Sequence, residues 1–300
     1  MYKIYPYFTN DGSVGLFSPE ADDIYHSSHG ALTEAWEKFV LPIKNLPRDI
    51  KILDICFGIG YNTKSFLEFL TNYATIDADN ISKFNLHIDA VDVDKNLAYL
   101  SPFFVTGKKN FKNNVLDFDN DKITRYLNGK TEPKYKLSRE TNIVIYELLR
   151  HCEEDFLPDE AAQLLCNRKY SIFYDNYIVN LHKRGFLHNI YYRNISRSYK
   201  KAVKCLKNNN ITLNLIIDDA RNAVKNSKEI YNYIFLDAFT PKKCPELWSV
   251  EFFKSLYEHL AEGGMVLTYS RAGNVREAFE QARFHVERRK NGMTATRRSL

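Results

Sequence analysis

Apolar residues gather in five short, nearly continuous runs along the chain. The runs are residues 51–56 (KILDIC), 86–93 (LHIDAVDV), 211–217 (ITLNLII), 233–236 (YIFL) and 265–269 (MVLTY). Strands that are covered on both faces, as in a parallel sheet, are continuously apolar and do not alternate with polar residues. The five runs therefore predict the strands of a parallel sheet.

Helical spacing of apolar residues occupies intervals between these runs. It predicts helices over residues 63–70, 245–260 and 273–282, and a last hairpin is expected from Val286. The pair Gly263–Gly264 is expected to stop the second helix, because glycine commonly follows a helix end. Strands that alternate with helices in this way are typical of an α/β fold.

One interval is much longer than the others. Residues 94–210, between the second and third predicted strands, are several times longer than a strand–helix–strand crossover needs. We therefore expect residues 107–210 to form an inserted subdomain, which the many Tyr, Leu and Phe residues predict to be folded and helical. Residues 1–300 are otherwise expected to form a single Rossmann-like domain, because candidate site residues lie on both sides of the insertion.

Composition limits the class of protein. The chain is 44% hydrophobic and 26% charged, which excludes global disorder. No apolar stretch is long enough to span a membrane, and the first residues lack the apolar core of a signal peptide, so a cytoplasmic protein is expected. The five cysteines form no CxxC pair, so neither a disulfide framework nor a metal site is expected.

Positive charge is concentrated in two segments, although the formal net charge of the chain is only +5. Residues 181–210 contain eight Lys and Arg and no acidic residue, with Phe and Tyr between them, and residues 281–300 add further Arg and Lys. Basic side chains with interleaved aromatics suit a nucleic acid. The alternative is a solvated helix face.

Residues that suit a nucleoside follow the first two predicted strands. Asp54 and the turn Gly58-x-Gly60 end the first strand, where glycine lets the backbone approach a ligand without interference from Cβ. Asp92 ends the second strand, where a carboxylate can accept hydrogen bonds from both ribose hydroxyls. Asp94 is the second choice for this role, and its alternative role is to cap the next helix.

Acidic residues also follow the third and fourth strands. Asp219, followed by Ala220, is expected to accept a hydrogen bond from an adenine amine, and Asp237 follows the fourth strand. Open α/β sheets bind ligands at these carboxyl ends. Thr63 stands in place of the third glycine of a dinucleotide-binding turn, and no Gly-Lys-Ser/Thr phosphate loop is present. The set therefore favours S-adenosyl-L-methionine, which has no phosphate.

Residues 237–248, DAFTPKKCPELW, resemble the signature of the MnmC-like methyltransferases. These correspond to the methyltransferase half of the bifunctional enzyme that makes 5-methylaminomethyl-2-thiouridine at the tRNA wobble position. The resemblance includes residues 23–34 and the turn 57–62, and it covers roughly residues 10–105 and 211–290. It implies a class I S-adenosylmethionine-dependent methyltransferase fold, in a stand-alone form.

The resemblance also implies the reaction and its residues. The expected activity is N-methylation of the 5-aminomethyl group of wobble (2-thio)uridine in tRNA. Asp237 is implied to orient the amine and take its proton, Phe239 and Pro241 to wall the methyl group and the base, and Tyr25 and Glu34 to close over the cofactor. The full cofactor-binding set is Tyr25, Glu34, Asp54, Phe57, Gly58, Gly60, Asn62, Asp92, Asp219, Ala220 and Asp237.

The implied partners are tRNA, bound by segments 181–210 and 281–300, and a separate protein for any preceding step on the tRNA side chain. Two positions depart from the family, since Cys56 stands where Gly is usual and Cys244 where Asn is frequent. Three other functions stay open. They are a polyamine (aminopropyl) synthase, a methyltransferase that acts on another amine, and a non-catalytic nucleic-acid-binding partner.

Overall fold

The computed structural model describes residues 5–18, 23–27, 29–44, 46–72, 83–103, 135–152 and 193–298. Of the predicted insertion, residues 107–134 and 153–192 lie outside these ranges. Its described parts include two helices, α5 (Arg139–Cys152) and α8 (Arg193–Asn208). Within the described ranges, no helix combines the length and the apolarity needed to cross a membrane.

The chain divides into two compact units. One comprises Met1–Ala35 and Asn96–Cys205, and the other comprises Trp36–Lys95 and Leu206–Leu300. Each unit is therefore built from two separate stretches of the sequence. All five predicted strands belong to the second unit, and the expectation of one domain with an insertion stays a prediction.

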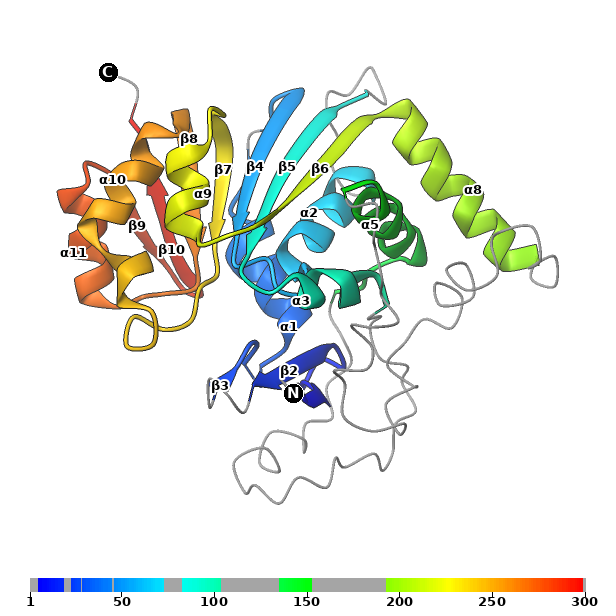
Figure 1. The fold of residues 1–300 in the computed structure, drawn as a ribbon, viewed down its shortest axis with the longest axis horizontal. Coiled ribbons are helices and arrows are strands. Elements are labelled where there is room, and N and C mark those ends of the chain that lie inside the picture. Colours follow the sequence, from blue (N-terminus) through cyan, green and yellow to red (C-terminus); the bar gives the residue numbers. More distant parts are fainter. Residues whose placement is uncertain are drawn as a thin grey trace. The chain divides into compact units, whose positions relative to one another are not determined.

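The second unit contains a seven-stranded sheet (Figure 1). Its strands are β4 (Asp49–Ile55), β5 (Asn85–Asp92), β6 (Asn210–Ile217), β7 (Tyr231–Leu236), β8 (Leu260–Thr268), β9 (His285–Arg289) and β10 (Gly292–Thr296). The order is β6-β5-β4-β7-β8-β10-β9. The five predicted strands and the hairpin are confirmed. The sheet is mixed rather than wholly parallel, because β10 pairs antiparallel with both β8 and β9.

Strand order reverses at the centre of this sheet. The chain moves outward from β4 to β5 and β6, and then returns to place β7 against the other side of β4. Open α/β sheets bind ligands outside the carboxyl ends of the strands at such a reversal. The ends of β4 and β7 therefore mark the expected position of a ligand.

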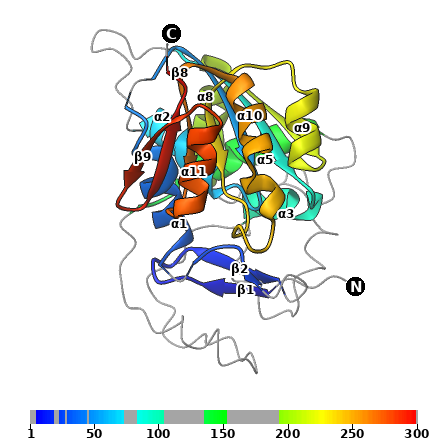
Figure 2. The same cartoon turned by 90° about the vertical axis from the view of Figure 1, so that its left-hand side faces the viewer.

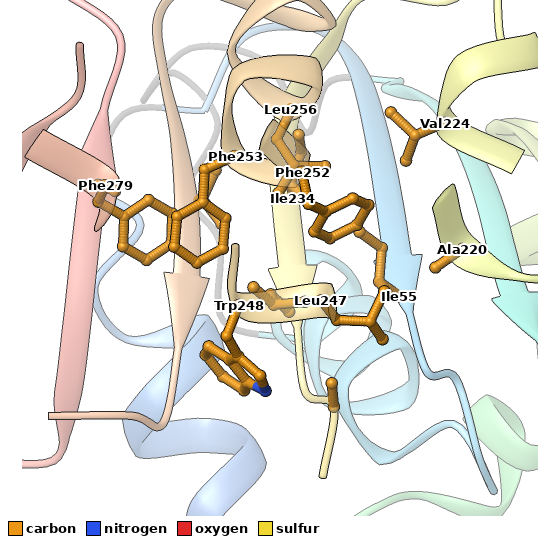
Figure 3. Close-up of a cluster of buried hydrophobic side chains, with 14 of the residues drawn as sticks. Ile55, Ala220, Val224, Ile234, Leu247, Trp248, Phe252, Phe253, Leu256 and Phe279 are labelled. Carbon is orange, nitrogen blue, oxygen red and sulfur yellow. The ribbon is translucent and has the colours of Figure 1, made fainter. Parts of the chain in front are cut away.

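Six helical segments among the described residues belong wholly or mainly to the second unit. They are the π-helix η1 (Ala35–Val40), α2 (Tyr61–Asn72), α9 (Ala220–Asn226), the 3-10 helix η5 (Pro245–Trp248), α10 (Val250–Glu258) and α11 (Gly273–Gln281). Figure 3 shows the core where α9, α10 and α11 pack beside β7 and β8, and the rings of Phe253 and Phe279 stack there with centroids 3.7 Å apart. Burial of these side chains ties the helices to the sheet.

The helix predicted over residues 245–260 is wrong in its extent. Ser249 ends η5 and begins α10, because its side chain accepts a hydrogen bond from the Phe252 backbone N–H. Gly263–Gly264 does not stop that helix but lies inside β8. Gly263 has a φ of +70°, and a Cβ on Gly264 would lie 2.9 Å from the carbonyl oxygen of Asn232. The glycines therefore permit an irregular strand that approaches its neighbour closely.

The first unit contains a small antiparallel sheet that the sequence pattern did not predict (dark blue in Figure 2). Its strands are β1 (Tyr5–Phe8), β2 (Val14–Ser18) and β3 (Asp23–Ile24), and the unit also holds α1 (Ala31–Glu34), most of α3 (Lys95–Leu100) and the 3-10 helix η2 (Ser101–Phe103). Buried Asp11 accepts hydrogen bonds from Thr9, Ser13 and Thr33, so it joins the β1–β2 turn to α1. The pair Asp11–Gly12 is a hairpin signal that could have revealed this sheet.

Candidate functional site

Strand register aligns four residues along the carboxyl edge of the large sheet. Ile55 of β4 pairs with Val91 of β5 and Leu236 of β7. Leu236 pairs in turn with Thr268 of β8. The next residues along β5, β4, β7 and β8 are Asp92, Cys56, Asp237 and Tyr269. Neighbouring strands lie about 4.8 Å apart, so these four residues form a row at the predicted ligand-binding edge.

The turn after β4 has the left-handed backbone that its glycines predict. Gly58 has a φ of +55° and Gly60 a φ of +70°. Cys56 also has a positive φ, +63°, a conformation that is costly for a residue with a Cβ and that favours glycine. The backbone N–H of Phe57 donates to the Val91 carbonyl, which attaches the turn to β5.

Asp92 closes the turn from the neighbouring strand. Its Oδ2 accepts a hydrogen bond of 2.7 Å from the Gly58 N–H, and its Oδ1 accepts one of 2.9 Å from the Asp94 N–H. The carboxylate is buried, and burial raises its pKa to about 6 against these stabilising bonds. Asp92 therefore fixes the glycine turn, and its predicted contact with ribose stays a prediction.

Asp54 lies beneath the turn and is fully buried. Thr63, which replaces the third glycine, donates from Oγ1 to Asp54 Oδ2 at 2.6 Å. The other oxygen, Oδ1, has no hydrogen-bond partner among the described residues. Burial, to which the charge of nearby Asp237 adds, raises the pKa of Asp54 to about 8. Sequence reasoning missed this role of Thr63, because nothing in the sequence indicates which acid its hydroxyl meets.

Asp237 is held at the centre of the row. Its Oδ2 accepts a hydrogen bond of 2.9 Å from Asn62 Nδ2 on α2, and its backbone N–H donates to the Ile55 carbonyl. The side chain is half-buried. The structure therefore brings together two residues that the sequence placed in one site from separate motifs, Asn62 after the glycine turn and Asp237 after β7.

The segment after Asp237 is fixed through one carbonyl group. Trp248 Nε1 donates to the Phe239 carbonyl oxygen at 2.8 Å, and Cys244 Sγ donates to the same oxygen at 3.0 Å. Trp248 is buried in the core that Figure 3 shows. Burial raises the pKa of the Cys244 thiol to about 11, so the thiol keeps its proton and acts as a donor. The half-buried Phe239 and Pro241 are thereby carried by a rigid turn.

Asp219, the acidic residue that follows the third predicted strand, has a local structural role. Asp219 caps α9 by accepting from the Arg221 backbone N–H, and both of its oxygens accept from the Arg221 guanidinium. Ala220 is packed into the core. The apolar side chains Val93 and Ile217, at the ends of β5 and β6, are 75% and 38% exposed. Exposed apolar residues beside buried acids are a further feature suited to a nucleoside, and the role of Asp219 with adenine stays a prediction.

Tyr25 and Glu34 belong to the first unit. Glu34 Oε1 accepts from the Ser27 hydroxyl at 2.6 Å and Oε2 accepts from the Ser27 N–H, so the glutamate fixes the loop that precedes α1. The Tyr25 backbone N–H donates to the Leu16 carbonyl. Both side chains are half-buried, and their closure over a cofactor stays a prediction.

The chain is similar to several known proteins. Residues 183–300 match a family described as S-adenosyl-L-methionine-dependent methyltransferase (Methyltransf_30). An uncharacterized protein of Methanocaldococcus jannaschii is 24% identical over 292 residues, which are 95% of this chain and 57% of that protein. The tRNA 5-methylaminomethyl-2-thiouridine biosynthesis bifunctional protein MnmC of Pseudomonas fluorescens is 34% identical over 98 residues, 33% of this chain and 15% of that protein.

MnmC of Paraburkholderia xenovorans is 35% identical over 74 residues, 25% of this chain and 11% of that protein. The chain thus spans little more than half of its archaeal relative and a small part of each MnmC protein. The crystal structure of MnmC2 from Aquifex aeolicus superposes with a TM-score of 0.58 at 20% identity, over 100% of this chain and 72% of that one. The predicted resemblance to the MnmC-like methyltransferases is confirmed by these matches, and the chain shares the Rossmann-like fold of the Aquifex protein. The family that residues 183–300 match is described as S-adenosyl-L-methionine-dependent, which supports this cofactor.

Proposed function

We propose that this protein is an S-adenosylmethionine-dependent N-methyltransferase that acts on the 5-aminomethyl group of wobble uridine in tRNA. The observation that carries the proposal is the position of Asp237, which Asn62 holds in one row with the glycine turn and Asp92. The names of the MnmC relatives, which make 5-methylaminomethyl-2-thiouridine in tRNA, support the choice of substrate. The expected setting is the cytoplasm.

The residues at and beside the carboxyl edge of the large sheet fit the cofactor. Asp54 Oδ1 is a buried carboxylate oxygen without a hydrogen-bond partner among the described residues, and such atoms normally have one. The ammonium group of the cofactor's amino-acid end, bound near this carboxyl, would favour its ionised form. Gly58 allows close backbone approach, Asp92 would bind the ribose, and exposed Val93 would contact the adenine. When bound, S-adenosylmethionine supplies an electrophilic methyl group on a sulfonium sulfur.

The role of Asp237 follows from the state of the substrate. A primary alkyl amine has a pKa of about 10, so it is mostly protonated near pH 7 and cannot attack carbon. A carboxylate that Asn62 holds in one orientation can bind the ammonium, accept a proton and keep the neutral amine in line. With the methyl group that the cofactor would supply, this nitrogen would form its new bond to carbon as the bond from that carbon to sulfur breaks. The product would be a secondary ammonium that keeps its two protons, so the one proton released is the proton that Asp237 has taken.

Helix α8 supports tRNA as the partner. Several of its residues with described side chains are exposed cations: Arg197, Lys200, Lys201, Lys204 and Lys207. Apart from the adjacent pair Lys200 and Lys201, each follows the one before it by three residues. Their helical spacing places them along one face, and the helix contains no Asp or Glu. Figure 1 shows α8 as one long helix. A row of cations along a rigid helix suits the phosphates of a polynucleotide.

The second basic segment, residues 281–300, has a different character. Arg289 donates to the carbonyl oxygens of Glu37, Lys38 and Met293, and Arg297 donates to those of Tyr257 and Leu260. These two arginines stabilise the fold, so the segment offers fewer cations to tRNA than its composition predicted. We propose α8 as the main tRNA contact, with a separate protein supplying the primary amine on the base.

The test is mass spectrometry of tRNA nucleosides after incubation with S-adenosylmethionine and tRNA that carries 5-aminomethyl-uridine. Conversion to 5-methylaminomethyl-uridine is expected, and persistence of the unmethylated nucleoside would contradict the proposal. Asp237→Ala should abolish turnover and leave cofactor affinity, measured by calorimetry, within a few-fold of wild type. An equal loss of both would reassign Asp237 to cofactor binding. Asp49→Ala, an exposed aspartate at the start of β4, is the matched control.

A further inference from the structure

Tyr269 occupies the row beside Asp237, one strand further from the glycine turn. Leu236 and Thr268 are partners in the β7–β8 ladder, so the residues that follow them, Asp237 and Tyr269, lie about one strand spacing apart, ~4.8 Å. On the other side of Asp237 the row continues with Cys56 and Asp92, where the cofactor is proposed to bind. Tyr269 therefore lies on the side of Asp237 away from the proposed cofactor position.

The ring of Tyr269 is held by two neighbours. Trp248 makes an edge contact with it, with ring centroids 5.8 Å apart and planes at 80°. The ammonium group of Lys38, on η1, lies over the ring at 5.5 Å from its centroid. Such contacts restrict the ring without burying it completely, and Tyr269 stays half-buried. Part of a fixed aromatic surface is thus exposed next to Asp237.

The distance between the amine and the ring of the substrate matches the distance between Asp237 and Tyr269. In 5-aminomethyl-uridine one methylene group separates the amine from the pyrimidine ring, so an amine at Asp237 places the ring about one strand spacing away. We infer that Tyr269 is the base-contacting residue of the site, against which the pyrimidine of the substrate nucleotide packs, with Lys38 and Trp248 as positioning residues. This inference rests on the proposed function, and it adds the reason why a pyrimidine rather than a simple alkyl amine is accepted.

The contribution of an aromatic contact with a base to binding affinity is known in other proteins. Removing one base–aromatic stack weakens binding roughly five- to hundred-fold. Leucine at position 269 would keep apolar bulk against Trp248 but would lose the aromatic face, whereas phenylalanine keeps that face and loses only the hydroxyl. Tyr269→Leu and Tyr269→Phe are therefore a matched pair in which only the first removes the proposed interaction.

The experiment measures direct binding of two anticodon stem-loops to wild type and to both variants. One stem-loop carries 5-aminomethyl-uridine at the wobble position, and the other has an abasic site there. Wild type and Tyr269→Phe should prefer the first RNA by roughly five- to hundred-fold, and Tyr269→Leu should lose most of that preference. Affinity for S-adenosylmethionine, measured by calorimetry, should stay within two-fold of wild type in both variants.

A Tyr269→Leu protein that binds cofactor normally and still prefers the modified RNA as wild type does would overturn the inference. If that variant fails to fold, the wild-type and Tyr269→Phe proteins still decide, because equal affinity for the abasic RNA refutes a base contact. Failure of the proposed function looks different. In that case wild type would not methylate the first RNA, whatever its binding preference.

Discussion

Burial of Asp54 makes a prediction about stability that is independent of turnover. Burial raises the pKa of this carboxyl in the folded protein to about 8, from its ordinary value of 3.8. A raised pKa means that the folded state binds the proton more tightly than the unfolded state does. The stabilising effect of this proton is fully present below about pH 4 and is lost as the pH rises through about 8. At pH 7 the unfolded chain ionises this carboxyl whereas the folded protein keeps it protonated, and this difference lowers the free energy of unfolding.

The variant Asp54→Asn removes this ionisation and nearly preserves shape. The ordinary pKa of 3.8 lies about 3 pH units below pH 7, and each unit corresponds to about 1.4 kcal/mol. Keeping Asp54 protonated in the folded state at pH 7 therefore lowers the free energy of unfolding by on the order of 4 kcal/mol. A buried amide N–H without a partner costs about 1–3 kcal/mol in return. The net gain in free energy of unfolding at pH 7 is therefore expected to be about 1–3 kcal/mol.

Urea unfolding of Asp54→Asn and wild type, followed between pH 4.5 and pH 8, measures this gain. The difference in free energy of unfolding should grow with pH by up to about 1.4 kcal/mol per unit. Asp49→Asn, which changes an exposed aspartate on the same strand, is the control for the removal of one negative charge. A difference between Asp54→Asn and wild type that is constant across the range would refute the reasoning. Cofactor affinity should fall in Asp54→Asn, because an ammonium group bound near Asp54 favours the ionised carboxylate and an amide cannot ionise.

Two further predictions concern the basic residues. Replacement of Lys200, Lys204 and Lys207 of α8 by Gln should weaken tRNA binding and reduce the slope of log affinity against log salt by about two to three. Arg289→Met should lower the free energy of unfolding by on the order of 3 kcal/mol, because three backbone carbonyls lose a charged donor. Arg288→Met, at the exposed neighbour on β9, should change it by less than about 0.5 kcal/mol in the same denaturation assay.

The lysine triple variant has a matched control in the second unit. Lys225, Lys228 and Lys254 are also exposed, and they lie outside α8. Changing these three to Gln removes the same charge from the protein, so an equal loss of tRNA affinity would show that only net charge matters. An unchanged salt dependence after the α8 substitutions would remove this helix from the proposed interface.

The sequence predicted those parts of the fold that depend on local patterns. Continuous apolar runs identified the five parallel strands, and the acids and glycines at their ends identified the edge where the row of side chains forms. The prediction for Gly263–Gly264 was wrong because glycine serves two purposes: it ends helices, and it lets strands approach closely. The second purpose applies here, as the nearby carbonyl oxygen of Asn232 shows, and the sequence alone does not reveal that contact.

Pairings between distant residues were not predictable from the sequence. The hydrogen bond from Thr63 to Asp54 and the contacts of Tyr269 depend on which side chains the folded chain brings together. Charge was similarly ambiguous. A count of cations treats Arg289 and Lys207 alike, although the first is hydrogen-bonded to backbone carbonyls and the second is exposed on α8.

The hydrogen bonds of Arg289 also constrain when the fold can be completed during synthesis. The arginine binds carbonyl oxygens of Glu37 and Lys38, and 252 positions of sequence separate it from Glu37. A ribosome makes η1 long before β9, and the exit tunnel covers the newest residues of a growing chain. The carbonyl groups of η1 therefore lack this donor until β9 has left the tunnel, so these two elements should join late in the folding of the second unit.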